Sequence, residues 1–236
     1  MILTAIAAIL LLGAFIATER MRRDRAMLPL NLFRRPAFSV ANGAAGTMNL
    51  CTLGTLFVLT LFLQSVQGYS PLIAGLSIVP LFLPLAVIAP FAGRLTSRVG
   101  SRLPVAAGLA VAAVGLALLV AAQAGSSYLV LLPAFMLWGV GLGILTPAVV
   151  AAAIAAVPGE RSGLASAINN TARQAGGAIG IAVAAAIAGQ PGGSGFLSGF
   201  HAVAVGSACL YLAAAVLALA LIPGAGKPSI QQSRAG

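Results

Sequence analysis

The sequence predicts an all-α integral membrane protein with seven transmembrane helices, and its composition and the placement of its charges carry that prediction. Of the 236 residues, 60% are hydrophobic and 7% are charged, whereas roughly 25% of the residues of a soluble domain are charged. The mean hydropathy is +1.07. The 13 Lys and Arg residues outnumber the 3 Asp and Glu residues and gather in short segments between long apolar runs. This pattern excludes a soluble nucleic-acid-binding protein and is typical of a membrane protein with basic loops.

Seven apolar runs are long enough to cross the hydrocarbon core, which takes about 20 helical residues. They cover residues 2–18, 38–64, 71–93, 103–123, 127–157, 162–188 and 200–222. We therefore expect a linker transmembrane helix at 1–18, a basic cytoplasmic loop at 19–37, a six-helix unit at 38–222 and a polar cytoplasmic tail at 223–236.

The connections between the runs alternate between basic and uncharged, and this alternation predicts the orientation. The basic ones contain Arg20, Arg22, Arg23, Arg25, Arg34 and Arg35, then Arg94, Arg98 and Arg102, then Arg161, and finally Lys227 and Arg234. Arg and Lys are retained on the cytoplasmic side of a membrane. We therefore expect the chain in the cell membrane with its amino terminus outside and its carboxyl terminus in the cytoplasm. The membrane lipid is then a partner, because we expect the arginines at 20–35 to touch anionic headgroups.

Polar side chains within the apolar runs fall on one side of a helix. At 100° per residue they occupy a stripe roughly 60° wide on the run 38–64 and about a quarter of the circumference on the run 162–188. As candidates for a solute path we take Asn42, Asn49, Thr60, Gln64, Asn170, Arg173 and Gln174. The alternative is interhelical hydrogen bonding, in which Asn, Gln and Thr join helices without touching a solute. The sequence leaves both interpretations open.

The run 127–157 carries small residues at helical spacing. Gly139 and Gly143 share one side of that helix, and Pro147 lies within it. Small residues let transmembrane helices approach closely, and proline is tolerated there because neighbours and water satisfy the freed carbonyls. We expect these three residues to serve helix packing.

Arg173 differs from the other polar residues because a guanidinium within a membrane span is costly and usually has a pairing or functional role. The acids Glu19, Asp24 and Glu160 all lie in predicted cytoplasmic loops. Arg173 must therefore snorkel to the interface or find a backbone carbonyl, water, a solute or an acid from elsewhere.

The connection from Gly93 to Arg102 reads GRLTSRVGSR. It is similar to the loop between paired helices in the major facilitator superfamily, whose pattern is G-x-L-x-D-R-x-G-R. Gly93, Arg98 and Gly100 match, whereas Ser97 stands where the family has Asp. The resemblance makes these residues candidates for a gating loop: Gly93, Arg94, Arg98, Gly100 and Arg102.

Three further segments resemble the fourteen-helix drug-proton antiporter branch of that superfamily. They are residues 63–76, the glycine-rich stretch 139–147 and the stretch 163–180, which includes SAINNTARQAGG. The agreement of several motifs in order, at the right helices, is more specific than any single glycine-rich match.

The resemblance implies that the chain is the carboxyl-terminal half of such a transporter. Its last six helices then form a major-facilitator half with 3+3 inverted repeats. The apolar runs 103–122 and 200–222 would be peripheral and lipid-facing. The implied function is proton-coupled efflux of small organic compounds without a cofactor, with the missing amino-terminal half or a second half-sized chain as partner.

A non-transporting membrane subunit or a gene remnant that needs a second half is the competing hypothesis, because one half offers no second wall for a solute path. No acid in the predicted spans is available to carry a proton. We do not expect an enzyme, because His201 stands alone without an acid-base partner. Cys51 and Cys209 supply no framework for a metal.

Overall fold

The computed structural model describes residues 10, 13–14, 17–18 and 30–224. The linker helix expected at 1–18 lies largely outside these residues, as do residues 19–29 of the basic loop and residues 225–236 of the tail. The described part contains six α-helices and no strand. They are α2 (Pro36–Ser65), α3 (Pro71–Val99), α4 (Arg102–Leu118), α5 (Leu132–Ala155), α6 (Ser162–Ala188) and α7 (Phe196–Leu221). All six are long and apolar enough to span a membrane, as the composition predicted for this part of the chain.

Local sequence signals explain where the helices begin and end. Proline occupies the first turn of α2, α3 and α5, where its missing N–H costs no helical hydrogen bond. The Ser70 hydroxyl accepts a hydrogen bond from the Ile73 N–H and so caps α3. At the other end of α3, Gly100 adopts φ +80°, a conformation that only glycine adopts readily.

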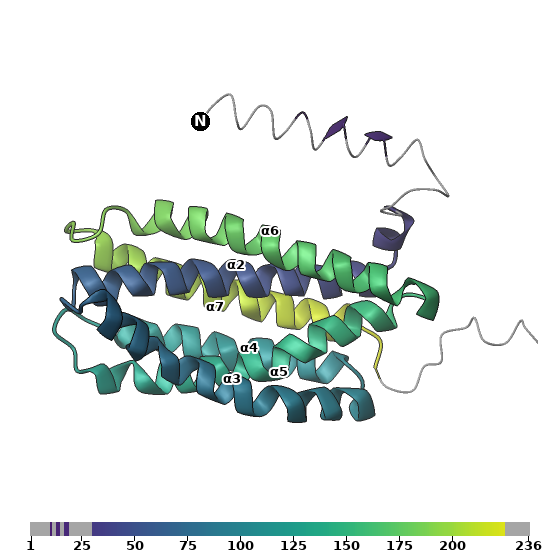
Figure 1. Cartoon of the computed structure of the whole chain (residues 1–236), viewed down its shortest axis with the longest axis horizontal. Helices are drawn as coiled ribbons and strands as arrows, with labels where there is room; N and C mark the ends of the chain where they lie inside the picture. Colours follow the sequence, from purple (N-terminus) through teal and green to yellow (C-terminus); the bar gives the residue numbers. More distant parts are fainter. Residues whose placement is uncertain (1–9, 11–12, 15–16, 19–29, 225–236) are drawn as a thin grey trace, which may run out of the picture.

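The helices form two layers. In the first layer α3 packs against α5, α5 against α2, and α2 against α6. In the second layer α4 packs against α7, with α4 behind α5 and α7 behind α2. Figure 1 shows α6 and α3 along opposite long sides of the bundle. The first layer therefore has α2 and α5 in its middle and α6 and α3 at its edges.

The pattern of helix contacts repeats itself when the first three helices are exchanged with the last three. The α2–α6 contact corresponds to the α5–α3 contact, and the α4–α5 contact corresponds to the α7–α2 contact. The α4–α7 and α2–α5 contacts each correspond to themselves. Two triplets of opposite topology, related by an axis in the membrane plane, produce this pattern.

Because successive helices run in opposite directions, the connections gather at two ends of the bundle (Figure 1). We call one the basic end; its described cations are Arg34, Arg35, Arg94, Arg98, Arg102 and Arg161. The uncharged end holds the other connections. There Gln67 Nε2 donates to the Gln123 carbonyl at 3.1 Å and His201 Nε2 donates to the Ala122 carbonyl at 2.7 Å. His201 therefore joins α7 to the connection between α4 and α5.

The expected loop from Gly93 to Arg102 was wrong in its extent. Helix α3 continues to Val99, and Arg102 is the first residue of α4, so only Gly100 and Ser101 lie between the helices. An apolar run ends where the hydrocarbon ends, whereas a helix continues until its backbone is turned. In α3 the helix ends at Gly100, where the positive φ angle turns the backbone.

Within this chain, α4 and α7, which the sequence predicts at the periphery, are more buried than α3 and α6. In each helix we compare an apolar segment of 18 residues. The buried share of this segment is 56% in α4 and 44% in α7, against 17% in α3 and 28% in α6. Uniform apolar composition identifies a membrane helix but does not say which neighbours it has. In α4, Gly108 and Gly115 allow the backbone of α5 to approach, because a β-carbon at either position would overlap backbone atoms of α5.

Glycines also set the spacing between α2 and α6. A β-carbon at Gly176 would overlap the Gly46 carbonyl oxygen, and one at Gly180 would overlap the Leu50 carbonyl oxygen. One at Gly54 would lie 2.6 Å from the Gly180 carbonyl oxygen. The two backbones are therefore in direct contact, as in other transmembrane pairs built on small residues.

The packing candidates of α5 lie at its contact with α3. A β-carbon at Gly139 would overlap the Leu81 carbonyl oxygen, and one at Gly143 would lie 3.0 Å from Ile88 Cβ. A β-carbon at Gly93 would lie 3.7 Å from Pro147 Cβ. All three residues therefore face α3, where their small size or rigid ring fixes the distance between the helices.

Tyr211 joins α7 to α2 in the middle of the bundle. Its hydroxyl donates to the Met48 carbonyl at 2.9 Å and lies 2.8 Å from Thr52 Oγ1. One turn away, Thr55 Oγ1 and Ser207 Oγ are 3.1 Å apart. These bonds satisfy polar groups that would otherwise be buried without partners.

We expect Tyr211→Phe to lower the free energy of unfolding by about 1–2 kcal/mol, because the variant removes two interhelical hydrogen bonds without changing the ring. Equilibrium unfolding in mixed detergent micelles measures this. Tyr69→Phe is the matched control, since no hydrogen bond joins the Tyr69 hydroxyl to a described residue. Equal losses in both variants would show that the Tyr211 bonds contribute nothing.

Candidate functional site

Asn42, the first solute-path candidate, is enclosed between helices. Its side chain is 4% exposed. Its Nδ2 donates to the Phe38 carbonyl at 2.8 Å, and its Oδ1 accepts a hydrogen bond from Asn169 Nδ2 at 3.3 Å. Asn42 therefore joins α2 to α6 by a hydrogen bond. This is the alternative to a solute path that the sequence left open for the polar stripes.

Thr60 and Gln64 lie apart from the other candidates, toward the uncharged end of α2. Both are half-buried, and the Thr60 hydroxyl donates to the Leu56 carbonyl of its own helix at 2.8 Å. Thr60 follows Asn49 by three turns of helix, roughly 16 Å. These two residues do not share a site with the candidates of α6.

Four candidates lie in one stretch of the α2–α6 pair. We call them the arginine cluster: Asn49, Asn170, Arg173 and Gln174. Asn170 and Gln174 are exposed on α6, and Arg173 between them is half-buried. A β-carbon built at Gly177, one turn after Arg173, would lie 3.8 Å from Asn49 Cβ. The structure therefore brings four of the seven candidates together, closes Asn42 into its pair with Asn169 one turn before Arg173, and separates Thr60 and Gln64 from them.

Arg173 has a guanidinium nitrogen that the described residues leave without a partner. Its Nε atom is buried and has no hydrogen-bond partner among them. Glu160, the acid within the described residues, lies in the turn η5 (Gly159–Arg161) at the basic end, roughly 20 Å away along α6. A buried charged group without a partner costs more than a neutral one. The cluster therefore suits a group that brings negative charge or strong acceptors.

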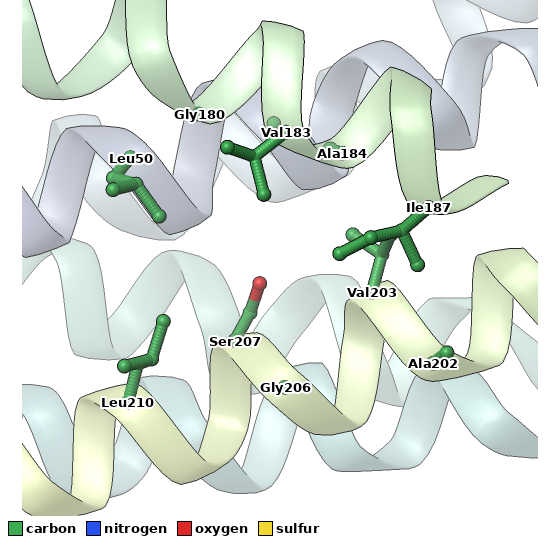
Figure 2. A pocket seen from close by; sticks show the side chains of 11 residues that line it. Leu50, Gly180, Val183, Ala184, Ile187, Ala202, Val203, Gly206, Ser207 and Leu210 are labelled. Atoms are coloured by element: carbon green, nitrogen blue, oxygen red, sulfur yellow. The ribbon is translucent and has the colours of Figure 1, made fainter.

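An apolar cleft of about 90 Å³ lies between α2, α6 and α7, and Figure 2 shows its side chains. Leu50, Val183 and Leu210 point into it, one from each helix. Ser207 supplies a hydroxyl, but that hydroxyl is paired with Thr55. The cleft therefore has an apolar character and differs from the arginine cluster.

The gating candidates lie at the basic end. Gly93, Arg94 and Arg98 belong to the last turns of α3, Gly100 is its C-cap, and Arg102 begins α4. The Arg94 guanidinium carbon lies 6.0 Å from the centre of the Phe91 ring, within reach of a cation–π attraction.

The described residues contain no group of three His, Cys, Asp or Glu side chains placed to hold a metal ion. Cys51 is buried in α2 and Cys209 is exposed on α7. The chemistry of the described site is therefore that of amide and guanidinium groups.

Two residues that join neighbouring helices to α2 were not among the candidates chosen from the sequence. Asn169 pairs with Asn42, and its helical angle places it at the edge of the stripe that contains Arg173. That signal was present in the sequence. Tyr211 bonds to a backbone carbonyl of α2, and nothing in the spacing of the sequence indicates this.

Comparison with known proteins decides the family. A model of the Major Facilitator Superfamily matches residues 1–181 and, in a second overlapping match, residues 81–236. The chain belongs to the major facilitator superfamily. Its relatives in this superfamily include the multidrug resistance protein Stp of Mycobacterium tuberculosis, which is 37% identical over 72% of this chain and 31% of its own length.

Two antibiotic resistance proteins of Streptomyces are also similar. The tetracycline resistance determinant of Streptomyces rimosus is 34% identical over 73% of this chain and 50% of its own length. The lincomycin resistance protein of Streptomyces lincolnensis is 34% identical over 92% of this chain and 45% of its own length. The chain therefore spans half or less of the length of these three relatives.

Proposed function

We propose that this chain forms one half of a drug-exporting transporter, the carboxyl-terminal half of the fourteen-helix branch, with the arginine cluster facing the solute path. The observation that carries the proposal is Arg173, whose Nε is buried within a membrane helix and has no partner among the described residues. Ionisable groups within a membrane mostly face a bundle interior or a solute path. The names of the relatives support export of antibiotics or related small organic compounds.

A second half completes the path in this proposal. Helices α3 and α6, at the two edges of the first layer, are the least buried of the six. Large apolar side chains such as Leu76, Leu83 and Ile179 are more than half exposed there. Transporters of this kind close two halves around a site near the membrane midplane. The missing amino-terminal half, or a second half-sized chain, would cover these helices.

Proton coupling, in the same proposal, depends on the second half. The three acids of the chain are Glu19, Asp24 and Glu160, and all lie outside the apolar runs. A carboxylate that binds and releases the proton within the membrane must then come from the partner. Arg173 would lower the proton affinity of such a carboxylate by stabilising its charged form.

The basic end is cytoplasmic in this proposal, because Arg and Lys are retained on that side. The fold supports this assignment by bringing arginines from three separate connections to the same end. Cysteine labelling at Ser101 and Gly192, at opposite ends of the bundle, distinguishes the two orientations. An impermeable reagent applied to whole cells should label Gly192→Cys and leave Ser101→Cys unlabelled.

A chimeric transporter tests the proposal. The part of the Streptomyces rimosus tetracycline determinant that this chain does not match is fused ahead of the chain, and the rate of tetracycline export is measured in cells. We expect export by the chimera at least tenfold above that of the chain alone. A chimera that reaches the membrane in normal amount and exports no tetracycline would favour the non-transporting alternative.

A further inference from the structure

A second cleft, of about 320 Å³, lies at the basic end, away from the arginine cluster. It is lined by Val99 at the end of α3, by Arg102 and Leu103 at the start of α4, by Leu219 in the last turn of α7 and by Gly224 after that helix. One cationic side chain therefore stands among apolar ones where three helix ends meet.

Arg102 lines this cleft, and one of its guanidinium nitrogens has no partner among the described residues. The residue is half-buried, and its Nε atom is buried with no hydrogen-bond partner among the described residues. Gly224 lies beside it, because a β-carbon there would be in van der Waals contact with Arg102 Nη1, at 3.7 Å. Arg102 is also the first residue of α4, whose preceding Ser101 makes no side-chain cap. The free N–H groups of that helix end add positive potential at the same place.

Among the described residues, the cleft brings Arg102 together with no acidic side chain. Arg98 lies in the last turn of α3, and Glu160 belongs to the connection between α5 and α6. The sequence that follows Gly224 contains Lys227 and Arg234 but no acidic side chain. The local excess of positive charge is therefore not relieved by this part of the chain.

The apolar side chains that line the cleft indicate which kind of anion would bind beside Arg102. Leu103 is 61% exposed and Leu219 is 39% exposed, although both line the cleft beside Arg102. A free phosphate would pair with the guanidinium but leave these side chains uncovered. A lipid phosphate brings its own acyl chain and covers them.

We propose that this cleft binds an anionic phospholipid, with the phosphate on Arg102 and the first acyl methylenes against Leu103 and Leu219. Arginine suits a phosphate because its planar fork donates two parallel hydrogen bonds. The site lies outside the arginine cluster, although Arg102 is also one of the gating candidates.

Native mass spectrometry of the purified full chain, titrated with phosphatidylglycerol or phosphatidylcholine, tests the proposal. We expect phosphatidylglycerol to bind at least tenfold more tightly than phosphatidylcholine, and Arg102→Gln to remove that preference. Arg161→Gln is the matched control, because it removes the same charge from an exposed position at the same end. It should change the affinity by less than twofold. Equal losses in the two variants would mean diffuse attraction to the basic end and would overturn the proposal.

Three further measurements distinguish the lipid from a free anion, from the tail of the chain and from a folding defect. Competition by millimolar inorganic phosphate would assign the site to a free anion and overturn the lipid assignment. In the full chain, Lys227→Gln with Arg234→Gln should leave binding within twofold; a loss equal to that of Arg102→Gln would assign the site to the tail. Should Arg102→Gln fail to fold, Leu219→Trp fills the cleft from its apolar side without changing charge. It should weaken phosphatidylglycerol binding at least fivefold, and unchanged binding would overturn the proposal.

Discussion

Replacing Gly180 by Leu is expected to lower the free energy of unfolding by more than 3 kcal/mol and to prevent α2 and α6 from packing. The β-carbon alone would overlap the Leu50 carbonyl oxygen. That oxygen belongs to the helix backbone and moves only if the whole helix moves. Overpacking that side-chain shifts can absorb costs roughly 1–3 kcal/mol, and separating two helices forfeits their contacts as well. Equilibrium unfolding in mixed micelles measures the loss.

Gly43→Leu is the control for that experiment. Gly43 lies on α2 and is exposed, and a β-carbon there meets nothing within 4 Å. We expect its unfolding free energy to stay within about 1 kcal/mol of the parent, since the change affects mainly helix propensity. If Gly180→Leu were as stable as Gly43→Leu, the close backbone contact between α2 and α6 would not determine the packing.

Replacing Arg173 by Ala is expected to reduce tetracycline export by the chimeric transporter at least tenfold. The guanidinium is the one cation of the arginine cluster, and its Nε has no partner in the described part of the chain. The proposal assigns it to a solute or to a carboxylate of the other half. A tenfold loss corresponds to about 1.4 kcal/mol of lost interaction. Arg173→Lys should restore part of the rate, because it keeps the charge but not the planar fork.

Export is normalised to the amount of transporter in the membrane, so that a folding defect is not read as a transport defect. Arg161→Ala, at the basic end, should export within twofold of the parent. Parental export by Arg173→Ala would remove Arg173 from the solute path. Export that falls only in proportion to the amount of folded protein would assign Arg173 a structural role.

Several features of the fold were predictable because they depend on local sequence. The positions of the six described helices follow from apolar runs of sufficient length, and the starts of α2, α3 and α5 follow from proline in the first turn. The grouping of arginines at one end follows from counting spans. The stripe on α6 was predictable because a helix repeats every 3.6 residues. The same arithmetic does not tell whether a stripe faces a neighbouring helix, water or a solute.

Asn42 and Arg173 illustrate that limit. Both belong to predicted stripes, yet Asn42 is closed into a pair with Asn169, whereas Arg173 Nε has no partner among the described residues. The burial of α4 could not be predicted either, because an apolar helix is equally compatible with lipid and with neighbouring helices. Its glycines allow α5 to approach, but which helix approaches depends on how the chain is arranged in three dimensions.

The sequence by itself determined that the chain spans a membrane, where its helices lie and which of its ends is basic, because these properties follow from hydropathy and charge along the chain. The tertiary structure alone decided that α2 pairs with α6 and α5 with α3, and that α4 lies in a second layer. It also placed Arg102 beside the end of α7. Those arrangements depend on which backbones can approach at glycine, and on residues far apart in the chain meeting across helices.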